Sequence, residues 1–129
     1  KSYDNTLEIF GAPGPLKKRV MKVLTDCKEL EEPKDPDTCN VFALYKLFAS
    51  EEEQADLAGR YRAGNFGYGT AKKELLAKMN EHFAPMREKR AELENNMDFV
   101  EAVLRKGAEK ARAETRQTLQ AARKAVGLE

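Results

Sequence analysis

The sequence has 129 residues, of which 41% are hydrophobic and 35% charged, and its net charge is only +1 at pH 7. This length fits one domain with a modest core, and no apolar run approaches the roughly 18 residues of a membrane span, so we expect no membrane contact. Cys27, Cys39 and His82 form neither a CxxC pair nor a Cys/His cluster. No metal site is therefore expected, and the two thiols fit a reducing compartment, although their spacing leaves a pairing open.

The chain begins with a polar stretch rich in turn-forming residues, KSYDNTLEIFGAPGP. This stretch has no charged region followed by an apolar run, so it is not a signal or transit peptide. Gly11, Pro13 and Gly14 interrupt any periodic structure, and we expect an irregular N-terminal loop.

Apolar residues at helical spacing predict five helices along the rest of the chain. The first helix begins at Pro15, because proline suits a first helical position. An acidic, extended connector from Asp26 to Thr38 leads to a short apolar helix around Val41 to Phe48. Ser50-Glu51-Glu52-Glu53 reads as a capping box for the third helix, which is expected to end near Gly64.

A glycine-punctuated turn at residues 65–70 leads into a long fourth helix. Pro85 lies inside the apolar stripe of this helix, and we expect a kink rather than a stop because the stripe resumes in register. The last helix is expected from about Met97 to Val126, with Asn96 as its cap. No segment alternates like a strand, so the sequence predicts an all-α domain, a bundle of about five helices.

Charge is unevenly distributed along the chain. From Asp26 to Asp56 ten acids stand against three lysines, a net charge of −7, whereas from Val100 to Val126 seven basic residues stand against three acids, a net charge of +4. A domain polarised in this way can present its basic end to a polyanion, which suggests a nucleic acid as partner.

The last helix separates its basic residues by type. At about 100° per residue one side of this helix is apolar, and along one edge of that side lie four arginines, Arg105, Arg112, Arg116 and Arg123, here called the Arg stripe. The far side carries three lysines, Lys106, Lys110 and Lys124. Guanidinium groups bind phosphate bidentately and stack on exposed bases, so the Arg stripe is a candidate RNA-binding site. The alternative is that the stems cover the edge of the core while their charges pair with acids of neighbouring helices.

Other groupings favour structural roles. Tyr68, flanked by glycines, is available for base stacking or marks a turn at a helix start, and we favour the turn. His82 has no partner base or nucleophile, so no triad-like site is expected. The acidic runs Glu29–Glu32 and Glu51–Glu53 read as connector and helix-start charges. From its residues alone, the chain is a polarised helical domain without a catalytic centre.

An ordered series of segments resembles one family. Lys1-Ser2-Tyr3-Asp4-Asn5-Thr6 is similar to the end of the KMSKS loop of class I aminoacyl-tRNA synthetases. Further matches follow in order at Val23–Asp26, Glu31–Asp37, Leu44–Tyr45, Leu47–Ala49, Tyr61–Gly64, Gly67–Gly69, Ala71–Lys72, Gly107–Ala108 and Lys110–Ala111. The run Glu-Glu-Pro-Lys-Asp-Pro-Asp points to the tryptophanyl rather than the tyrosyl branch. The chain thus resembles the C-terminal part of bacterial tryptophanyl-tRNA synthetases over essentially its whole length.

This resemblance implies that residues 1–13 are the end of the KMSKS loop and a linker from a catalytic domain, and that residues 14–129 are a helical anticodon-binding domain. In the family the loop contacts the ATP phosphates, so Lys1 and Ser2 become the candidate catalytic and ATP-binding residues. The implied partners are tRNA(Trp), Mg-ATP and tryptophan, and the implied full-length enzyme is a cytoplasmic homodimer.

The HIGH-type motif and the tryptophan pocket of the family have no counterpart in these 129 residues. We therefore expect the full-length enzyme to activate tryptophan with ATP and to charge tRNA(Trp), and this chain alone to be inactive and to hold no ATP. An alternative is a free-standing helical RNA-binding or interaction module derived from such an enzyme.

Overall fold

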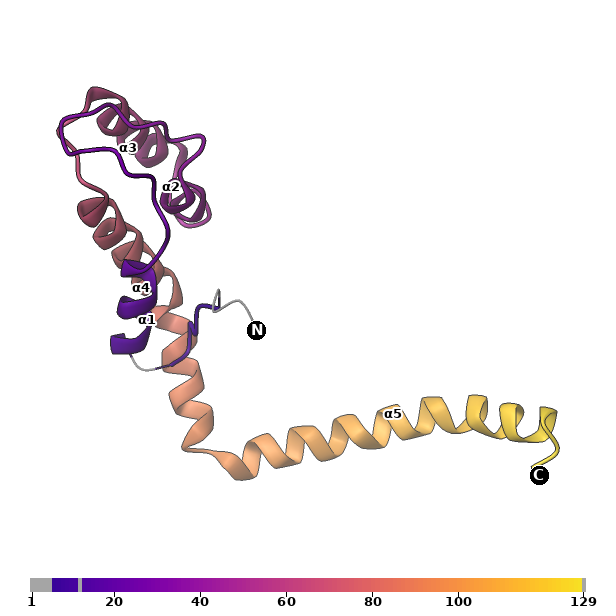
Figure 1. The fold of residues 1–129 in the computed structure, drawn as a ribbon. Coiled ribbons are helices and arrows are strands. Elements are labelled where there is room, and N and C mark those ends of the chain that lie inside the picture. The colour runs from indigo at the N-terminus through magenta and orange to yellow at the C-terminus, as the bar shows by residue number, and fades with distance from the viewer. Residues whose placement is uncertain (1–5, 12, 129) are drawn as a thin grey trace. The chain divides into compact units, whose positions relative to one another are not determined.

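The structure, a computed structural model, describes residues 6–11 and 13–128. These residues form five helices and no strand (Figure 1): α1 (Pro13–Met21), α2 (Asn40–Tyr45), α3 (Glu51–Ala63), α4 (Tyr68–Glu94) and α5 (Met97–Ala125). The all-α prediction is therefore confirmed. The chain divides into two compact units, Lys1–Arg87, here the first unit, and Glu88–Glu129, here the second unit. The domain boundary at residue 14 that the resemblance implies stays a prediction.

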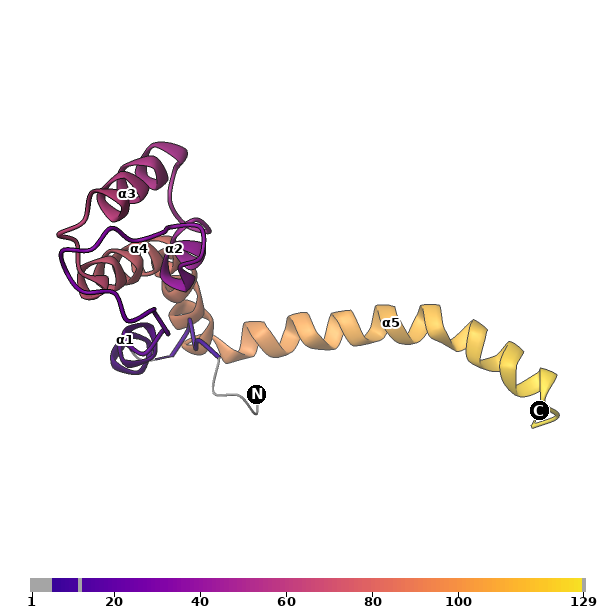
Figure 2. The same cartoon turned by 45° about the horizontal axis from the view of Figure 1, so that its top comes forward.

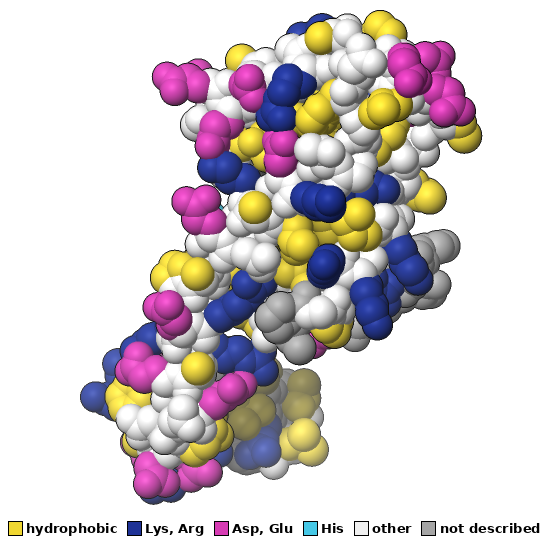
Figure 3. Space-filling view, turned by 90° about the vertical axis from the view of Figure 1, so that its left-hand side faces the viewer, with side chains coloured by type: hydrophobic (Ala, Val, Ile, Leu, Met, Phe, Trp, Pro, Cys, Tyr) yellow, Lys and Arg dark blue, Asp and Glu magenta, His cyan; other side chains and the backbone are white. Residues whose placement is uncertain are grey.

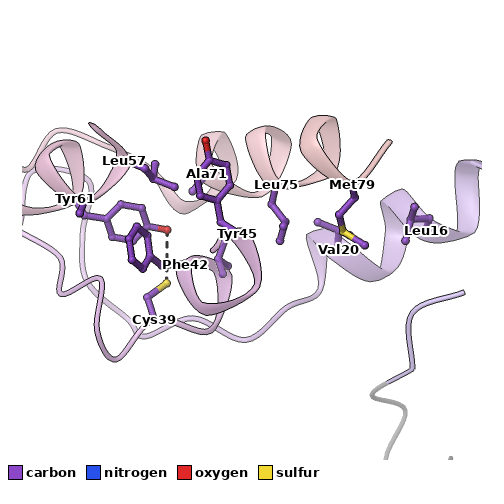
Figure 4. Close-up of a cluster of buried hydrophobic side chains, with 12 residues drawn as sticks. Leu16, Val20, Cys39, Phe42, Tyr45, Leu57, Tyr61, Ala71, Leu75 and Met79 are labelled. Atoms are coloured by element: carbon purple, nitrogen blue, oxygen red, sulfur yellow. Dashed lines mark hydrogen bonds between the residues drawn. The ribbon is translucent and has the colours of Figure 1, made fainter. Parts of the chain in front are cut away.

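The core of the first unit is formed by α1, α2, α3 and the first half of α4, which Figure 2 shows grouped together. Its buried side chains recur every three or four positions, the spacing that places them on one face of each helix. They include Leu16, Val20, Val41, Phe42, Tyr45, Leu57, Tyr61, Ala71, Leu75 and Met79 (Figure 4). At one end of this cluster the Tyr61 hydroxyl lies 3.6 Å from the Sγ of Cys39.

Local sequence signals fix the ends of α3 and the course of α4. The capping box is confirmed, because the Glu53 N–H donates to Ser50 Oγ and the Ser50 N–H donates to Glu53 Oε2, at 3.3 and 2.9 Å. As predicted, α3 ends at Gly64. α4 continues through Pro85, so the proline does not end the helix, and the boundary between the units falls just after it.

The N-terminal segment of the first unit is irregular in residues 6–11, as predicted, but it is attached to the helices. Leu7 and Ile9 pack against the core. The Nε of Arg87 donates to the Ile9 carbonyl oxygen at 2.8 Å, and the Phe10 ring meets the Phe83 ring edge to face at 6.3 Å. α4 therefore holds this segment by both polar and aromatic contacts.

The acidic connector between α1 and α2 is wound around one buried cation. Lys34 is only 3% exposed, and its Nζ donates to the carbonyl oxygens of Glu29, Leu30 and Glu32 at 2.6, 3.2 and 3.1 Å. Its backbone N–H donates to the Tyr61 carbonyl oxygen at 2.7 Å, which joins the connector to α3. The sequence predicts an extended connector here. The structure instead shows a compact loop, because the ammonium group gathers three backbone acceptors.

Gly64 allows this loop to approach the end of α3. Its φ is +76°, in the left-handed region that favours glycine, and a Cβ at this position would overlap the Glu31 carbonyl oxygen. The contact is with backbone rather than with a flexible side chain, so the connector itself would have to move to make room for a methyl group.

We expect Gly64→Ala to lower the free energy of unfolding by about 2–4 kcal/mol, because backbone strain adds to the displacement of the connector. Gly59→Ala is the matched control: this glycine lies inside α3 with open space around its Cβ position. The control should raise the free energy of unfolding by up to about 1 kcal/mol. Urea unfolding measures both, and a Gly64→Ala midpoint equal to that of the wild type would refute the close approach.

Candidate nucleic-acid interface

The second unit is dominated by α5, an amphipathic helix of 29 residues. Within this unit none of the residues of α5 is buried. Its apolar side is open, since Leu104, Leu119 and Val126 are 66%, 51% and 71% exposed. The helix therefore offers a long surface made of an apolar side and its charged borders.

Both ends of α5 lie close to their predicted positions. Asn96 occupies the N-cap, as predicted, but its side chain makes no capping hydrogen bond. At the other end the N–H groups of Gly127 and Leu128 donate to the carbonyl oxygens of Lys124 and Arg123, at 3.2 and 2.9 Å. This is a Schellman motif, and the φ of +76° at Gly127 is the left-handed conformation that it needs.

All four arginines of the Arg stripe are exposed in the structure. They lie within an arc of about 40° on the helix and extend over about 27 Å of its axis. Arg105, Arg112 and Arg116 form no ion pair within residues 88–128, where ion pairs join Lys89 to Glu92 and Arg90 to Glu94. Within the second unit the arginine stems cover no core, because α5 buries none of its residues. The RNA-binding role of the stripe stays a prediction.

The two residues predicted to contact ATP, Lys1 and Ser2, lie outside the described residues. His82 is exposed, and its ring lies against Phe48 and Phe83 with centroids 5.3 and 4.8 Å apart. Among residues 6–11 and 13–128 no three His, Cys, Asp or Glu side chains are placed to hold a metal ion. No helix there is long and apolar enough to span a bilayer, and Cys27 and Cys39 are both free.

Tyr68 is used inside the protein, as the turn interpretation predicts. It is the first residue of α4, and its hydroxyl donates to Asp26 Oδ1 at 2.7 Å. Its ring meets the Tyr61 ring edge to face at 5.8 Å, and the Lys34 ammonium lies 5.4 Å from its centroid. The hydrogen bond from Tyr68 lowers the pKa of Asp26, because it stabilises the carboxylate.

One cationic element is not anticipated by the periodicity arguments. α1 and the residue after it carry Lys17, Lys18, Arg19 and Lys22, with no acid between Pro13 and Lys22. The charge composition of this short segment alone would have identified the cationic element. A charge count over a longer window does not, because the acidic connector follows directly and cancels the positive charge.

Comparison with known proteins identifies relatives along nearly the whole chain. No family model matches it. The chain is 47% identical to the tryptophan–tRNA ligase of Fusobacterium nucleatum, covering 99% of this chain and 39% of that protein. It is 44% identical to the tryptophan–tRNA ligase of Rhodopirellula baltica, covering 99% of this chain and 40% of that protein. This chain is a homologue of tryptophan–tRNA ligases.

The chain spans about two fifths of the length of these curated tryptophan–tRNA ligases. The fold agrees as well as the sequence. A crystal structure of tryptophanyl-tRNA synthetase from Campylobacter jejuni, complexed with ADP and tryptophan, matches with a TM-score of 0.89 and 38% identity, covering 98% of this chain and 40% of that one. The family resemblance that the sequence motifs indicate is therefore confirmed.

Several segments that resemble tryptophan–tRNA ligases meet at one place in the first unit. The run Glu31–Asp37 contains Lys34, whose N–H is bound by the last turn of α3 in the segment Tyr61–Gly64. The segment Gly67–Gly69 contributes Tyr68, whose ring receives the Lys34 ammonium. In this chain these segments therefore build a structural loop around Lys34.

We expect Tyr68→Phe to raise the pKa of Asp26 toward its ordinary value of 3.8, which an NMR titration of the carboxyl group can measure. Because the pKa of Asp26 is lower in the folded than in the unfolded chain, this pair stabilises the fold above the unfolded pKa and loses its effect as pH falls through the folded pKa. The stability difference between wild type and Tyr68→Phe should therefore shrink from pH 7 to pH 3. An unchanged difference would contradict the assignment.

Proposed function

We propose that this chain is the tRNA-binding helical part of a tryptophan–tRNA ligase and that it recognises the anticodon of tRNA(Trp). The observation that carries this proposal is the homology, which extends over 99% of the chain at 47% identity. The described residues supply no catalytic constellation that would favour an independent activity, whereas α5 supplies exposed cations suited to a polyanion.

The Arg stripe is the surface that we assign to the anticodon arm. Single-stranded RNA loops are recognised by stacking on flat side chains and by hydrogen bonds to bases and phosphates, and guanidinium groups provide both. The spacing of Arg105, Arg112, Arg116 and Arg123 along about 27 Å of helix allows them to follow several nucleotides. Their exposure supports this assignment, because a stem that covered a core would be buried.

In the whole protein we propose the activity of the relatives: activation of tryptophan with ATP, followed by charging of tRNA(Trp). Lys1 and Ser2 would then lie in the loop that contacts the ATP phosphates. A lysine ammonium there stabilises charge that develops as pyrophosphate leaves, which makes its effect largest in the transition state. The same family assignment proposes a cytoplasmic homodimer.

Each single Arg→Gln change in the Arg stripe should weaken tRNA(Trp) binding and reduce the slope of log K against log salt concentration by about one for each phosphate that the variant no longer binds. Glutamine keeps much of the stem and removes the charge. An arginine that stacks on an anticodon base should also lose about 1–3 kcal/mol of discrimination against tRNAs with other anticodons. Electrophoretic mobility shifts at several salt concentrations measure both effects.

The matched controls are Lys106→Gln, Lys110→Gln and Lys124→Gln, which remove the same charge from the far side of α5. They should leave binding nearly unchanged. If the lysine changes weaken tRNA binding while the arginine changes only lower the melting temperature, the proposed orientation of α5 is wrong and the stems of the Arg stripe have a structural role.

The 129-residue chain by itself should not support tryptophan-dependent exchange of pyrophosphate into ATP, since it contains only Lys1 and Ser2 of the proposed ATP site. The full-length ligase of Fusobacterium nucleatum serves as the positive control. Exchange by the isolated chain above the background without tryptophan would overturn this proposal.

A further inference from the structure

α1 has one face fixed in the core and the other open. Leu16 and Val20, four residues apart, are 1% and 0% exposed and anchor the helix against the first unit. Lys72 of α4 also donates from Nζ to the Met21 carbonyl oxygen at 3.2 Å, which holds the end of α1 in place. The position of the open face is therefore determined by packing.

Three lysines project from the sides and outer face of this anchored helix. Lys17, Lys18 and Lys22 are exposed, and none of them forms an ion pair with a described residue. Lys18 and Lys22 are four positions apart, so two like charges lie next to each other on the surface, which destabilises a helix. Cations near a helix C-terminus interact favourably with the helix dipole, which explains basic residues in the last turn of α1. The dipole does not explain why residues 13–22 contain no acid.

The lysines border an open hollow along α1. Its volume is about 710 Å³, and its lining includes Pro15, Met21 and the lysine stems. Figure 3 shows Lys and Arg side chains next to hydrophobic ones on one face of the molecule. The exposed ammonium groups of these lysines can meet the phosphates of a sugar–phosphate backbone.

A nucleic acid fits this surface better than a lipid bilayer does. A helix that lies in a membrane interface needs large apolar side chains free to insert. Leu16 and Val20 of α1 are instead buried in the core. What remains is a cationic surface without an insertion face, on a homologue of enzymes that bind tRNA.

We propose that Lys17 and Lys18 on α1 and Lys22 directly after it form a second RNA-contact surface, here the α1 surface, which binds tRNA phosphates without regard to sequence. This surface lies in the first unit and is separate in sequence from the Arg stripe. The inference rests on the proposed tRNA-binding function, but it does not require anticodon recognition. The α1 surface contributes affinity and salt dependence, and the Arg stripe contributes the choice of tRNA.

The triple variant Lys17→Gln/Lys18→Gln/Lys22→Gln tests this surface with tRNA(Trp) and with a tRNA that has another anticodon. The slope of log K against log salt concentration should fall by about three, and the Kd should rise at least about tenfold near 0.1 M salt, equally for both tRNAs. The control Lys106→Gln/Lys110→Gln/Lys124→Gln removes the same charge and should change the slope little. Urea unfolding verifies folding, and if the triple variant does not fold, Lys18→Gln alone should lower the slope by about one.

The two proposals fail in different ways. A triple variant with the Kd and slope of the control variant overturns the α1 surface, as does binding of the wild type to phosphatidylserine vesicles but to neither tRNA. If the wild type binds both tRNAs equally, the anticodon proposal fails. Equal loss of both tRNAs in the α1 variant would still support the α1 surface.

Discussion

The arrangement of the first unit depends on the burial of one ammonium group. An unpaired buried charge is strongly unfavourable, so the Lys34 side chain is stable in its position only with hydrogen-bond acceptors around it. The connector supplies three carbonyl oxygens, and the ring of Tyr68 lies on a further side. The close approach at Gly64 and the Asp26–Tyr68 hydrogen bond follow from the same placement, which joins the connector to α3 and to the start of α4.

Acidic and basic side chains are exposed on different segments of the chain. The acidic connector directs carbonyl oxygens toward Lys34, and its Glu29, Glu31 and Glu32 residues stay exposed. Exposed carboxylates repel a polyanion, whereas the lysines of α1 and the Arg stripe of α5 attract it. A nearly neutral chain can therefore present strongly cationic surfaces, because the net charge of +1 is the sum of acidic and basic regions.

Three of the segments that resemble tryptophan–tRNA ligases build the scaffold of the first unit. Glu31–Asp37, Tyr61–Gly64 and Gly67–Gly69 meet around Lys34, and none of them adds a reactive group there. A buried cation, a glycine with positive φ and a half-buried tyrosine each tolerate few replacements without loss of stability.

The sequence by itself determined the features that depend on neighbours three or four residues apart. These are the all-α class, the capping box at Ser50, the end of α3 at Gly64 and the continuation of α4 through Pro85.

Tertiary structure decided what depends on distant partners. Tyr68 donates its hydrogen bond to Asp26, which is 42 residues away. The connector is compact because Lys34 donates to its backbone carbonyl oxygens, and helical periodicity does not predict such contacts. Asn96 lies at the predicted N-cap position of α5, but its side chain makes no capping hydrogen bond. Local residue spacing predicts the position of a cap, whereas the hydrogen bond depends on the side-chain geometry. The cations of α1 face outward because Leu16 and Val20 fix the opposite face of the helix in the core.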